Sequence, residues 1–419
     1  MATRYDLFLE LANKNCSIKT SEFVKIFKKN KYQYNNIYRM LKDLTKEKLA
    51  VNTKLGFQIK LSQRSRLLYR LITYCVSNGI NYNYLLDKEL AKFISKALLK
   101  IEFGLADFKI DPKTFKKYTK ILIEYELIIK VSSKPFRARI VWNYLLSNLL
   151  QYFNIKPVVK KEKNVNFLDE IRKELFIFNR KVKKNERTYN ELIKPLEIKF
   201  IHSSLSLEGN PITLPNTIKI LKDKVIPKDL KVLNVKETQN YYSALNIALK
   251  NAINIVPLNK ERILNYHFLA MQHRERIAGK IRTVSVYIKG NPLFKVAKLK
   301  DVEPLLNELM KEYNLFIKKK HTLKELISFV SYFHNQFQYI HPFIDGNSRT
   351  TRLLVFHILN YVKIPLLFIP LGVLDQYLSN TKAYKKREDK ELFKTLQLII
   401  LYNLKTLNEK LEKWNQQKS

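Results

Sequence analysis

A short polar segment, His341–Arg352, lies between two runs whose apolar residues repeat with helical spacing, 323–340 and 353–361. Pro342 and Gly346 interrupt this spacing, and both residue types are frequent in turns. The sequence therefore predicts two helices joined by a tight turn, which would bring the polar side chains of the segment into one small region.

The second of these helices is expected to start inside the segment, where Asn347 or Ser348 can act as its N-cap. The first backbone N–H groups of a helix have no partner within the helix, so they form a binding site for anions. Arg349 and Arg352 are three residues apart and lie on one helix face. The segment also holds a titratable base and a carboxylate, His341 and Asp345. This set is typical of phosphoryl or nucleotidyl transfer; the alternative is an ordinary helix–turn–helix with surface arginines.

The segment also resembles the signature of the Fic family, His-x-Phe-x-Asp/Glu-Gly-Asn-Gly-Arg-x-x-Arg. The resemblance implies an all-helical core that moves AMP from ATP to a Ser, Thr or Tyr hydroxyl of a protein. It implies His341 as the general base and Asp345 as the ligand of Mg²⁺. It assigns the phosphates of ATP to a set of five residues, Gly346, Asn347, Ser348, Arg349 and Arg352.

One position departs from the signature, because Ser348 stands where the family usually has a second glycine. We expect a helical φ at Ser348, since the second helix begins here, and a serine then costs little. A positive φ would instead add strain of about 1–3 kcal/mol and shift the position of ATP.

A second informative stretch runs from Ser204 to Gly209 and reads as a helix end, because Pro211 prevents the helix from continuing. Glu208 opposes the helix dipole there and needs a cation beside it. The stretch resembles the inhibitory helix of Fic proteins, at about 195–209. The resemblance implies that Ser204 belongs to this element and that Glu208 pairs with Arg352, where it would block the γ-phosphate of ATP.

The run from Arg282 to Gly290 alternates apolar and polar residues and predicts a short β-hairpin. It resembles the flap beside the active site of Fic proteins, which would bind the target segment by strand addition. The flap residues are Arg282, Val284, Val286 and Ile288. Together with Glu237-x-x-Asn240, which resembles a helix under the flap, the resemblance covers roughly residues 165–405.

Residues 1–64 predict three short helices and a two-stranded wing, so they resemble a winged helix-turn-helix. The third helix should expose residues suited to base edges and phosphates, Gln33, Asn35, Asn36, Arg39 and Lys42. A protein-interaction or spacer domain is the alternative. A second helical or winged-helix-like domain is predicted at 65–155, a lysine-rich linker at 156–164 and the Fic domain at 165–419. The expected fold class is therefore mainly α.

The composition excludes several classes of protein. A hydrophobic content of 46% argues against a disordered chain, and no apolar run approaches the length of a membrane span. Cys16 and Cys75 form no disulfide or metal pattern and Met1–Glu10 has no signal core, so we expect a cytoplasmic protein with free thiols. The other histidines are interpreted as structural or exposed. The net charge of +40 is spread over the chain and favours acidic partners without identifying one.

Other readings of the function stay open. Glu208 could position a water molecule, so that the enzyme removes AMP from a modified protein. The chain could instead be a regulator whose residues 1–64 bind DNA and whose core senses a nucleotide. The resemblance also allows AMP transfer to the chain itself and a homodimer, although no residue in the sequence predicts a dimer.

Overall fold

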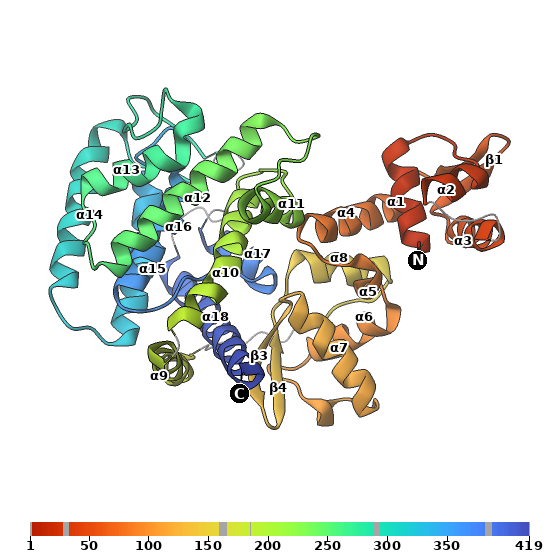
Figure 1. The fold of residues 1–419 in the computed structure, drawn as a ribbon, viewed down its shortest axis with the longest axis horizontal. Coiled ribbons are helices and arrows are strands. Elements are labelled where there is room, and N and C mark those ends of the chain that lie inside the picture. The colour runs from red at the N-terminus through yellow and green to blue at the C-terminus, as the bar shows by residue number, and fades with distance from the viewer. Residues whose placement is uncertain are drawn as a thin grey trace. The chain divides into compact units, whose positions relative to one another are not determined.

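Helices make up most of the chain, and the strands form two separate two-stranded sheets in the described residues (Figure 1). The structure is a computed structural model, and it describes residues 2–27, 33–158, 166–184, 186–288, 294–381 and 388–418. Contacts within the chain define an N-terminal and a C-terminal unit. The N-terminal unit comprises Met1–Ile101, Lys109–Ile121 and Tyr144–Lys160, and the C-terminal unit comprises Glu102–Phe108, Leu122–Asn143 and Lys161–Ser419. The prediction of a mainly α fold is confirmed.

The N-terminal unit contains eight α-helices, of which α7 extends beyond it, and one hairpin among its described residues. They are α1 (Arg4–Lys14), α2 (Thr20–Ile26), α3 (Tyr34–Lys46), β1 (Ala50–Thr53), β2 (Gly56–Ile59), α4 (Gln63–Ser77), α5 (Tyr82–Leu85), α6 (Lys88–Ala97), α7 (Pro112–Glu124) and α8 (Tyr144–Tyr152). Helix α3 buries Ile37, Leu41 and Leu44 against its neighbours.

A glycine fixes the hairpin turn of β1 and β2. Gly56 has a φ of +130°, and a Cβ atom there would lie 2.6 Å from the carbonyl oxygen of Ile18. Ile18 in turn pairs with Phe57 as an isolated bridge, which adds one residue to the edge of the hairpin. The two strands predicted in this region are therefore present as the antiparallel hairpin of β1 and β2.

The C-terminal unit contains one hairpin and most of the helices. Its strands and α-helices are β3 (Ile128–Ser133), β4 (Phe136–Ile140), α9 (Leu168–Lys184), α10 (Glu186–Ser206), α11 (Leu214–Ile218), α12 (Val232–Ile253), α13 (Lys260–Met271), α14 (Val302–Ile317), α15 (Leu323–Ile340), α16 (Asn347–Tyr361), α17 (Leu374–Thr381) and α18 (Asp389–Lys418). Shorter turns of helix are η2 (Leu105–Asp107), η3 (Lys219–Asp223, a π-helix), η4 (Gln272–Arg274), η5 (Leu299–Asp301) and η6 (Leu371–Val373).

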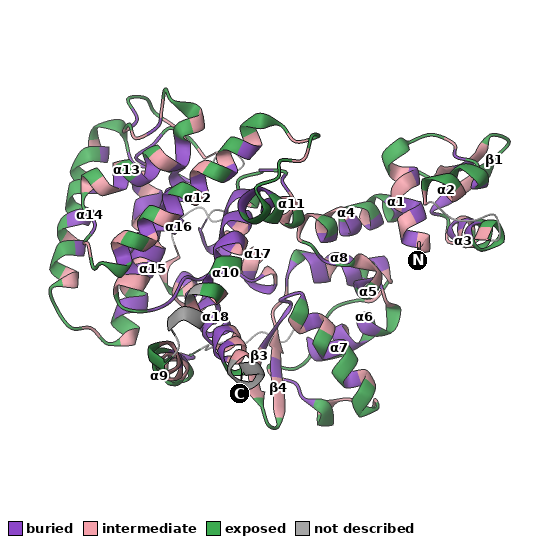
Figure 2. Cartoon of the chain, in the orientation of Figure 1, coloured by how far each residue is buried: buried purple, intermediate pink, exposed green. Residues whose placement is uncertain are grey.

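Helix α16 lies at the centre of this unit and packs against α12, α13 and α15. Most of its residues are buried, polar ones included, and Figure 2 shows α15, α16 and α18 as largely buried segments. Helix α15 begins with a capping box, in which Thr322 and Glu325 satisfy each other's backbone N–H groups. The loop from α15 to α16 thus joins two buried helices, and a shift of either helix would expose buried side chains to water.

The predicted hairpin from Arg282 to Gly290 is wrong for its described residues, because 282–288 form no strand. Residues 289–293, which include the expected turn, lie outside the described residues. Val284 is 51% exposed and Val286 and Ile288 are only half-buried, so the alternating apolar side chains have no fully covered face to pack against. A two-stranded hairpin without such a face is marginally stable in water.

The structure can also be compared with the predicted bounds of the linker and of the helix that ends near Glu208. The predicted linker at 156–164 lies mostly outside the described residues, which stop at 158 and resume at 166. The predicted helix at 195–209 is part of the longer α10, which starts at Glu186 and ends at Ser206. In the described part of the chain, no helix has the length and apolar content that a membrane span requires.

Candidate active site

The predicted turn between α15 and α16 is closed by hydrogen bonds of its own residues. His341 ends α15 with a left-handed backbone, at a φ of +49°, which turns the chain away from the helix axis. Within the loop, the Asn347 side chain accepts from the N–H of Phe343, four residues earlier, at 3.0 Å and donates to its carbonyl at 2.8 Å. The Phe343 ring is fully buried. Asn347 therefore shapes the loop, a role that its place in the signature did not predict.

Gly346 is the one residue of this loop that could not carry a side chain. Its φ is +82°, and an added Cβ atom would lie 2.8 Å from the sulfur of Met271 and 3.0 Å from Nε2 of His267. The left-handed backbone and the lack of space both require glycine here.

His341 is oriented by a hydrogen bond to the last turn of α15. Its Nδ1 lies 3.1 Å from the carbonyl oxygen of Gln338, and a carbonyl can only accept, so Nδ1 carries the proton of the neutral ring. Nε2 is then the basic nitrogen. This is the tautomer that a general base at the loop would need.

A second histidine, His267 on α13, supports the loop from below. Its Nε2–H donates to the carbonyl of Asp345 at 2.9 Å, and its Nδ1 accepts from the N–H of Gly279 at 2.9 Å. The ring stacks on Phe343, with centroids 3.6 Å apart and planes within 3°. Burial lowers the pKa of His267 to about 4, so the ring is neutral at physiological pH.

Asp345 is held by two arginines. Its Oδ1 accepts from Arg349 at 2.8 Å, and its Oδ2 lies 2.9 Å from Arg274 on η4. Burial alone would raise the pKa of Asp345, but Arg349, the N–H of Gly346 and Arg274 outweigh it and lower the pKa below its usual value. Among the described residues, no three His, Cys, Asp or Glu side chains gather as a metal cage. A cation at Asp345 would therefore need further oxygen ligands from a bound phosphate, as Mg²⁺ commonly has.

Each arginine of α16 is paired with a glutamate from another helix or turn. Arg349 is 4% exposed and forms an ion pair with Glu237 on α12. Arg352 is 5% exposed and donates to Glu208 at 3.0 Å and to the Ser204 carbonyl at 2.7 Å. The predicted contact between Glu208 and Arg352 is therefore present.

Ser204 contributes a second bond to the same guanidinium, because its hydroxyl lies 3.1 Å from Nε of Arg352. Burial by itself would lower the pKa of Arg352, but the charge of Glu208 raises it above the ordinary value. The arginine is thus fully charged, and its charge is balanced within the chain.

Ser348 lies in the first turn of α16, and its φ is not positive. The expectation of a helical backbone at this residue is confirmed. Serine therefore adds no backbone strain at the position where the signature has glycine.

Arg282 has a different environment from the one predicted. It is 3% exposed, and its guanidinium donates to the carbonyls of His341, Val284 and Ala297 at 2.8, 3.0 and 2.6 Å. Its backbone N–H donates to the carbonyl of Pro342 at 2.8 Å. Arg282 thus fastens the segment after Gly279 to the loop, whereas Val284 is exposed and Val286 and Ile288 are half-buried.

The structure brings His341, Asp345, Asn347, Arg349 and Arg352 together around one helix start, with Glu208 and Ser204 against the second arginine. Sequence reasoning missed the contacts of His267, Arg274 and Glu237. Of these three residues, only Glu237 was indicated by the sequence, because Glu237-x-x-Asn240 resembles a helix that lies under the flap of Fic proteins.

Residues 257–359 match the family model described as Fic/DOC family. A protein adenylyltransferase Fic from Nematostella vectensis is 28% identical over 222 residues, which are 50% of this chain and 48% of that protein. One of the same name from Drosophila persimilis is 26% identical over 182 residues, 42% of this chain and 34% of that protein. The chain thus spans about half or less of the length of these relatives.

Two solved structures match part of the chain. A Fic domain containing signaling protein from Bacteroides thetaiotaomicron has a TM-score of 0.49 at 17% identity, covering 59% of this chain and 98% of that one. Fic-1 from C. elegans has the same TM-score and identity, covering 58% of this chain and 71% of that one. The signature loop lies within the matched residues, and the chain therefore contains a domain of the Fic/DOC family that includes residues 257–359.

Proposed function

We propose that the chain transfers AMP from ATP to a hydroxyl group of a protein, and that Glu208 restrains this activity. The observation that carries the proposal is Arg352, a buried arginine at the start of α16 that is bound by Glu208 and Ser204 together. The adenylyltransferase names of the relatives support the type of reaction.

The residues of the loop suit an in-line transfer. His341 would take the proton of the target hydroxyl with Nε2, while Nδ1 stays bonded to Gln338. Arg349 and Arg352 would hold the phosphates that leave as pyrophosphate, beside the first N–H groups of α16. Asp345 would hold Mg²⁺, which supplies positive charge to the phosphate oxygens when it is bound.

Nucleotide binding would require the present ion pairs to open. Arg352 cannot bind a phosphate and Glu208 with the same guanidinium N–H group, so the two compete. Arg274 and Arg349 likewise occupy both oxygens of Asp345, which a cation would need. These ion pairs support the proposal of a restrained state, in which Glu208 takes the place of an anionic ligand at Arg352.

The same glutamate supports an alternative reaction at this site. With AMP bound, Glu208 could orient a water molecule and drive removal of AMP from a modified protein. Both reactions use His341 and Arg352, so the loop by itself does not favour one direction. The two reactions differ in their response to the loss of Glu208. Its loss would increase the transfer of AMP to a protein and abolish the removal of AMP from a modified protein.

Replacement of Glu208 by glycine is expected to raise transfer of label from α-labelled ATP, with Mg²⁺, to protein by about 10- to 100-fold, because it removes a charge-assisted hydrogen bond that competes with the phosphates. Glu208→Gln should give an intermediate rise. The matched control is Glu303→Gln, which removes one carboxylate from a surface pair with Lys260. Label incorporation that stays at the wild-type level in Glu208→Gly contradicts the proposal.

A second function, DNA binding, is proposed for residues 1–64. Their order of three helices and a hairpin resembles a winged helix-turn-helix, and α3 exposes Asn35, Asn36, Arg39 and Lys42. Such side chains suit phosphates and base edges in a major groove.

The double change Arg39→Ala and Lys42→Ala is expected to weaken binding of the full chain to duplex DNA. It should also reduce the slope of the logarithm of the binding constant against the logarithm of the salt concentration by about one to two, because each lost cation leaves one phosphate without its contact. Fluorescence anisotropy over a range of salt measures both quantities. Lys92→Ala, which removes a lysine from a surface pair on α6, is the control. Equal affinities for all three proteins would exclude α3 as the DNA-binding element.

A further inference from the structure

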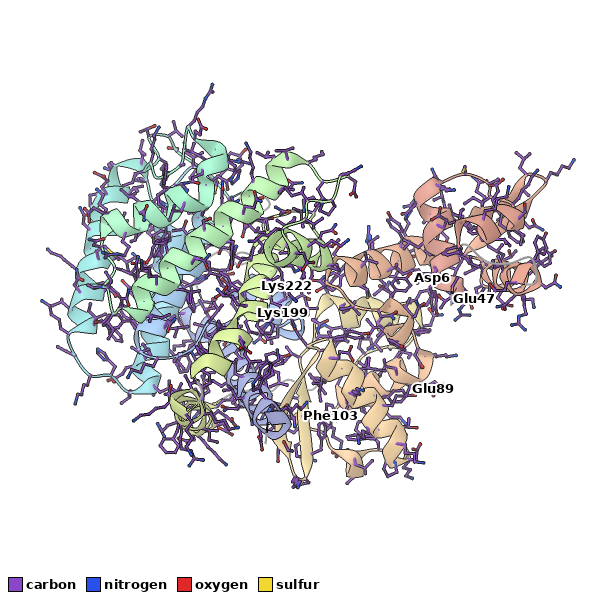
Figure 3. All side chains as sticks on the ribbon, viewed as in Figure 1. Asp6, Glu47, Glu89, Phe103, Lys199 and Lys222 are labelled. Carbon is purple, nitrogen blue, oxygen red and sulfur yellow. The ribbon has the colours of Figure 1, made fainter. Side chains whose placement is uncertain are left out.

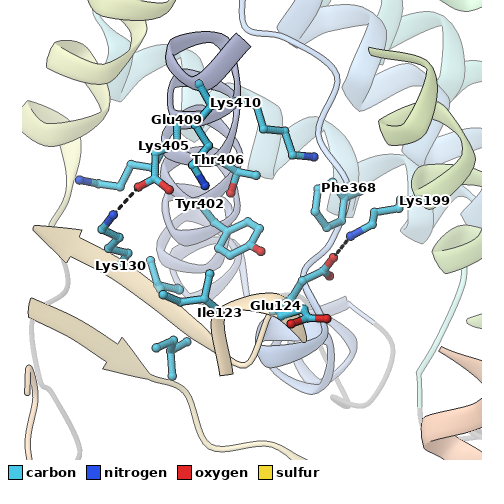
Figure 4. A pocket seen from close by; sticks show the side chains of 14 residues that line it. Ile123, Glu124, Lys130, Lys199, Phe368, Tyr402, Lys405, Thr406, Glu409 and Lys410 are labelled. Atoms are coloured by element: carbon cyan, nitrogen blue, oxygen red, sulfur yellow. Dashed lines mark hydrogen bonds and ion pairs between the residues drawn. The ribbon is translucent and has the colours of Figure 1, made fainter. Parts of the chain in front are cut away.

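The C-terminal unit contains a pocket of about 290 Å³ that no step of the proposed reaction uses (Figure 4). Strand β3, helix α10 and helix α18 contribute its walls. Its charged lining residues are five lysines and three glutamates, Lys130, Lys199, Lys405, Lys410, Lys413, Glu124, Glu126 and Glu409. The lining therefore has more positive than negative charge.

Three of the lysines are balanced by groups of the chain. Lys130 pairs with Glu409 at 2.7 Å, and Lys199, which is labelled on α10 in Figure 3, pairs with Glu126. Lys405 lies 3.3 Å from Glu174 and donates to a backbone carbonyl of β3. For Lys410 and Lys413, the described part of the chain provides no ion pair or hydrogen bond.

Lys410 is the more telling of these two, because it is half-buried. Burial and the nearby charge of Lys199 lower the pKa of Lys410, against the opposing effect of Glu126. A buried ammonium group beside another ammonium group is unfavourable unless an anion joins them. The positive charge of Lys410 lies beside the pocket, so an anion bound there would offset its repulsion with Lys199.

Aromatic side chains give the pocket an apolar part. Phe368 and Tyr402 line it, and the ammonium of Lys199 lies 5.1 Å from the ring centre of Phe368. Burial raises the pKa of Tyr402, so its phenol stays protonated and can donate a hydrogen bond. In Figure 4 the phenol oxygen points to the side where Lys199 and Lys410 lie.

We propose that this pocket binds a small phosphate monoester, with the dianion between Lys410, Lys199 and the Tyr402 phenol and an apolar group against Phe368. A dianion matches the two positive charges of Lys410 and Lys199, of which Lys410 has no carboxylate partner among the described residues, and a monoester leaves one end free for the aromatic wall. Lys199 would be shared between the ligand and Glu126. The site does not depend on AMP transfer, because none of its residues belongs to the loop after α15.

Isothermal titration calorimetry of the full chain with phenyl phosphate tests this site. Wild-type protein is expected to bind the probe more tightly than inorganic phosphate, and Lys410→Met to weaken binding by about tenfold or more, because one charge-assisted hydrogen bond is lost. Lys394→Met is the matched control, since Lys394 lies on the same helix in a surface pair with Glu391. Its affinity for phenyl phosphate should equal that of the wild type.

A titration in the presence of a non-hydrolysable ATP analogue separates this pocket from the active site. Affinity for phenyl phosphate that does not change with the analogue supports the proposal. Displacement by the analogue, equal affinities of wild type and Lys410→Met, or no heat of binding to the wild type would each overturn it. Thermal unfolding of Lys410→Met at or above the wild-type temperature shows that a loss of binding is not a loss of folding.

Discussion

Replacement of His341 by alanine in a Glu208→Gly chain is expected to lower AMP transfer by about 10²- to 10⁴-fold, the usual contribution of a general base. The Glu208→Gly background is needed because the proposed restraint by Glu208 would leave the wild-type chain little activity to lose. His341 is oriented for this role by the bond from its Nδ1 to Gln338, which leaves Nε2 as the base. The measurement is the initial rate of label transfer from α-labelled ATP.

Binding of ATP separates the chemical role of His341 from a structural one. The phosphates are assigned to Arg349, Arg352 and the start of α16, so the dissociation constant of ATP should stay within about threefold of the parent, a difference of less than one hydrogen bond. An unchanged rate of AMP transfer in the His341→Ala variant rules out His341 as the base. A large loss of ATP affinity would instead assign His341 a structural role.

The shape of the loop was predictable because the forces that form it act locally. Pro342 and Gly346 force the turn, and Asn347 closes it over four residues of chain, so the sequence near the loop determines its shape. The contact of Glu208 with Arg352 spans most of the domain. It was predictable because a glutamate at a helix end is unfavourable without a cation, and the family pattern indicates which cation.

The rest of the site depends on packing that no local pattern encodes. Arg274 and Glu237 reach Asp345 and Arg349 only because α12 and α13 pack beside α16. The run after Arg282 shows the converse. Its alternation predicted strands, but alternation stabilises a strand only when one face is covered, and the side chain of Val284 is exposed.

His267 is the clearest case of a residue whose role comes from its surroundings, and its titration is expected to make the stability of the protein depend on pH. The ring is fully buried, and its neutral form both donates to Asp345 and accepts from Gly279. Its pKa is lowered by burial to about 4, against 6.5 in the unfolded chain. Between these values the unfolded state binds a proton that the folded state does not. Stability is therefore complete above pH 6.5 and is lost as the pH falls towards 4.

The expected loss is about 1.4 kcal/mol per pH unit, or about 3 kcal/mol over the whole range, for each such histidine. Urea unfolding of the wild type and His267→Gln between pH 7.5 and 4.5 measures it. The variant should be less stable at pH 7.5, because two hydrogen bonds and the stacking on Phe343 are weakened, yet its free energy of unfolding should fall less steeply with acid.

His357 is the matched control, since burial lowers its pKa to about 4 as well and its ring contacts Tyr266 instead of the loop. His357→Gln should remove an equal share of the slope and leave ATP binding intact, whereas His267→Gln should weaken ATP binding, because the carbonyl of Asp345 and the ring of Phe343 lose their support. Parallel pH curves for wild type and His267→Gln would mean that the buried ring is not the proton-linked group.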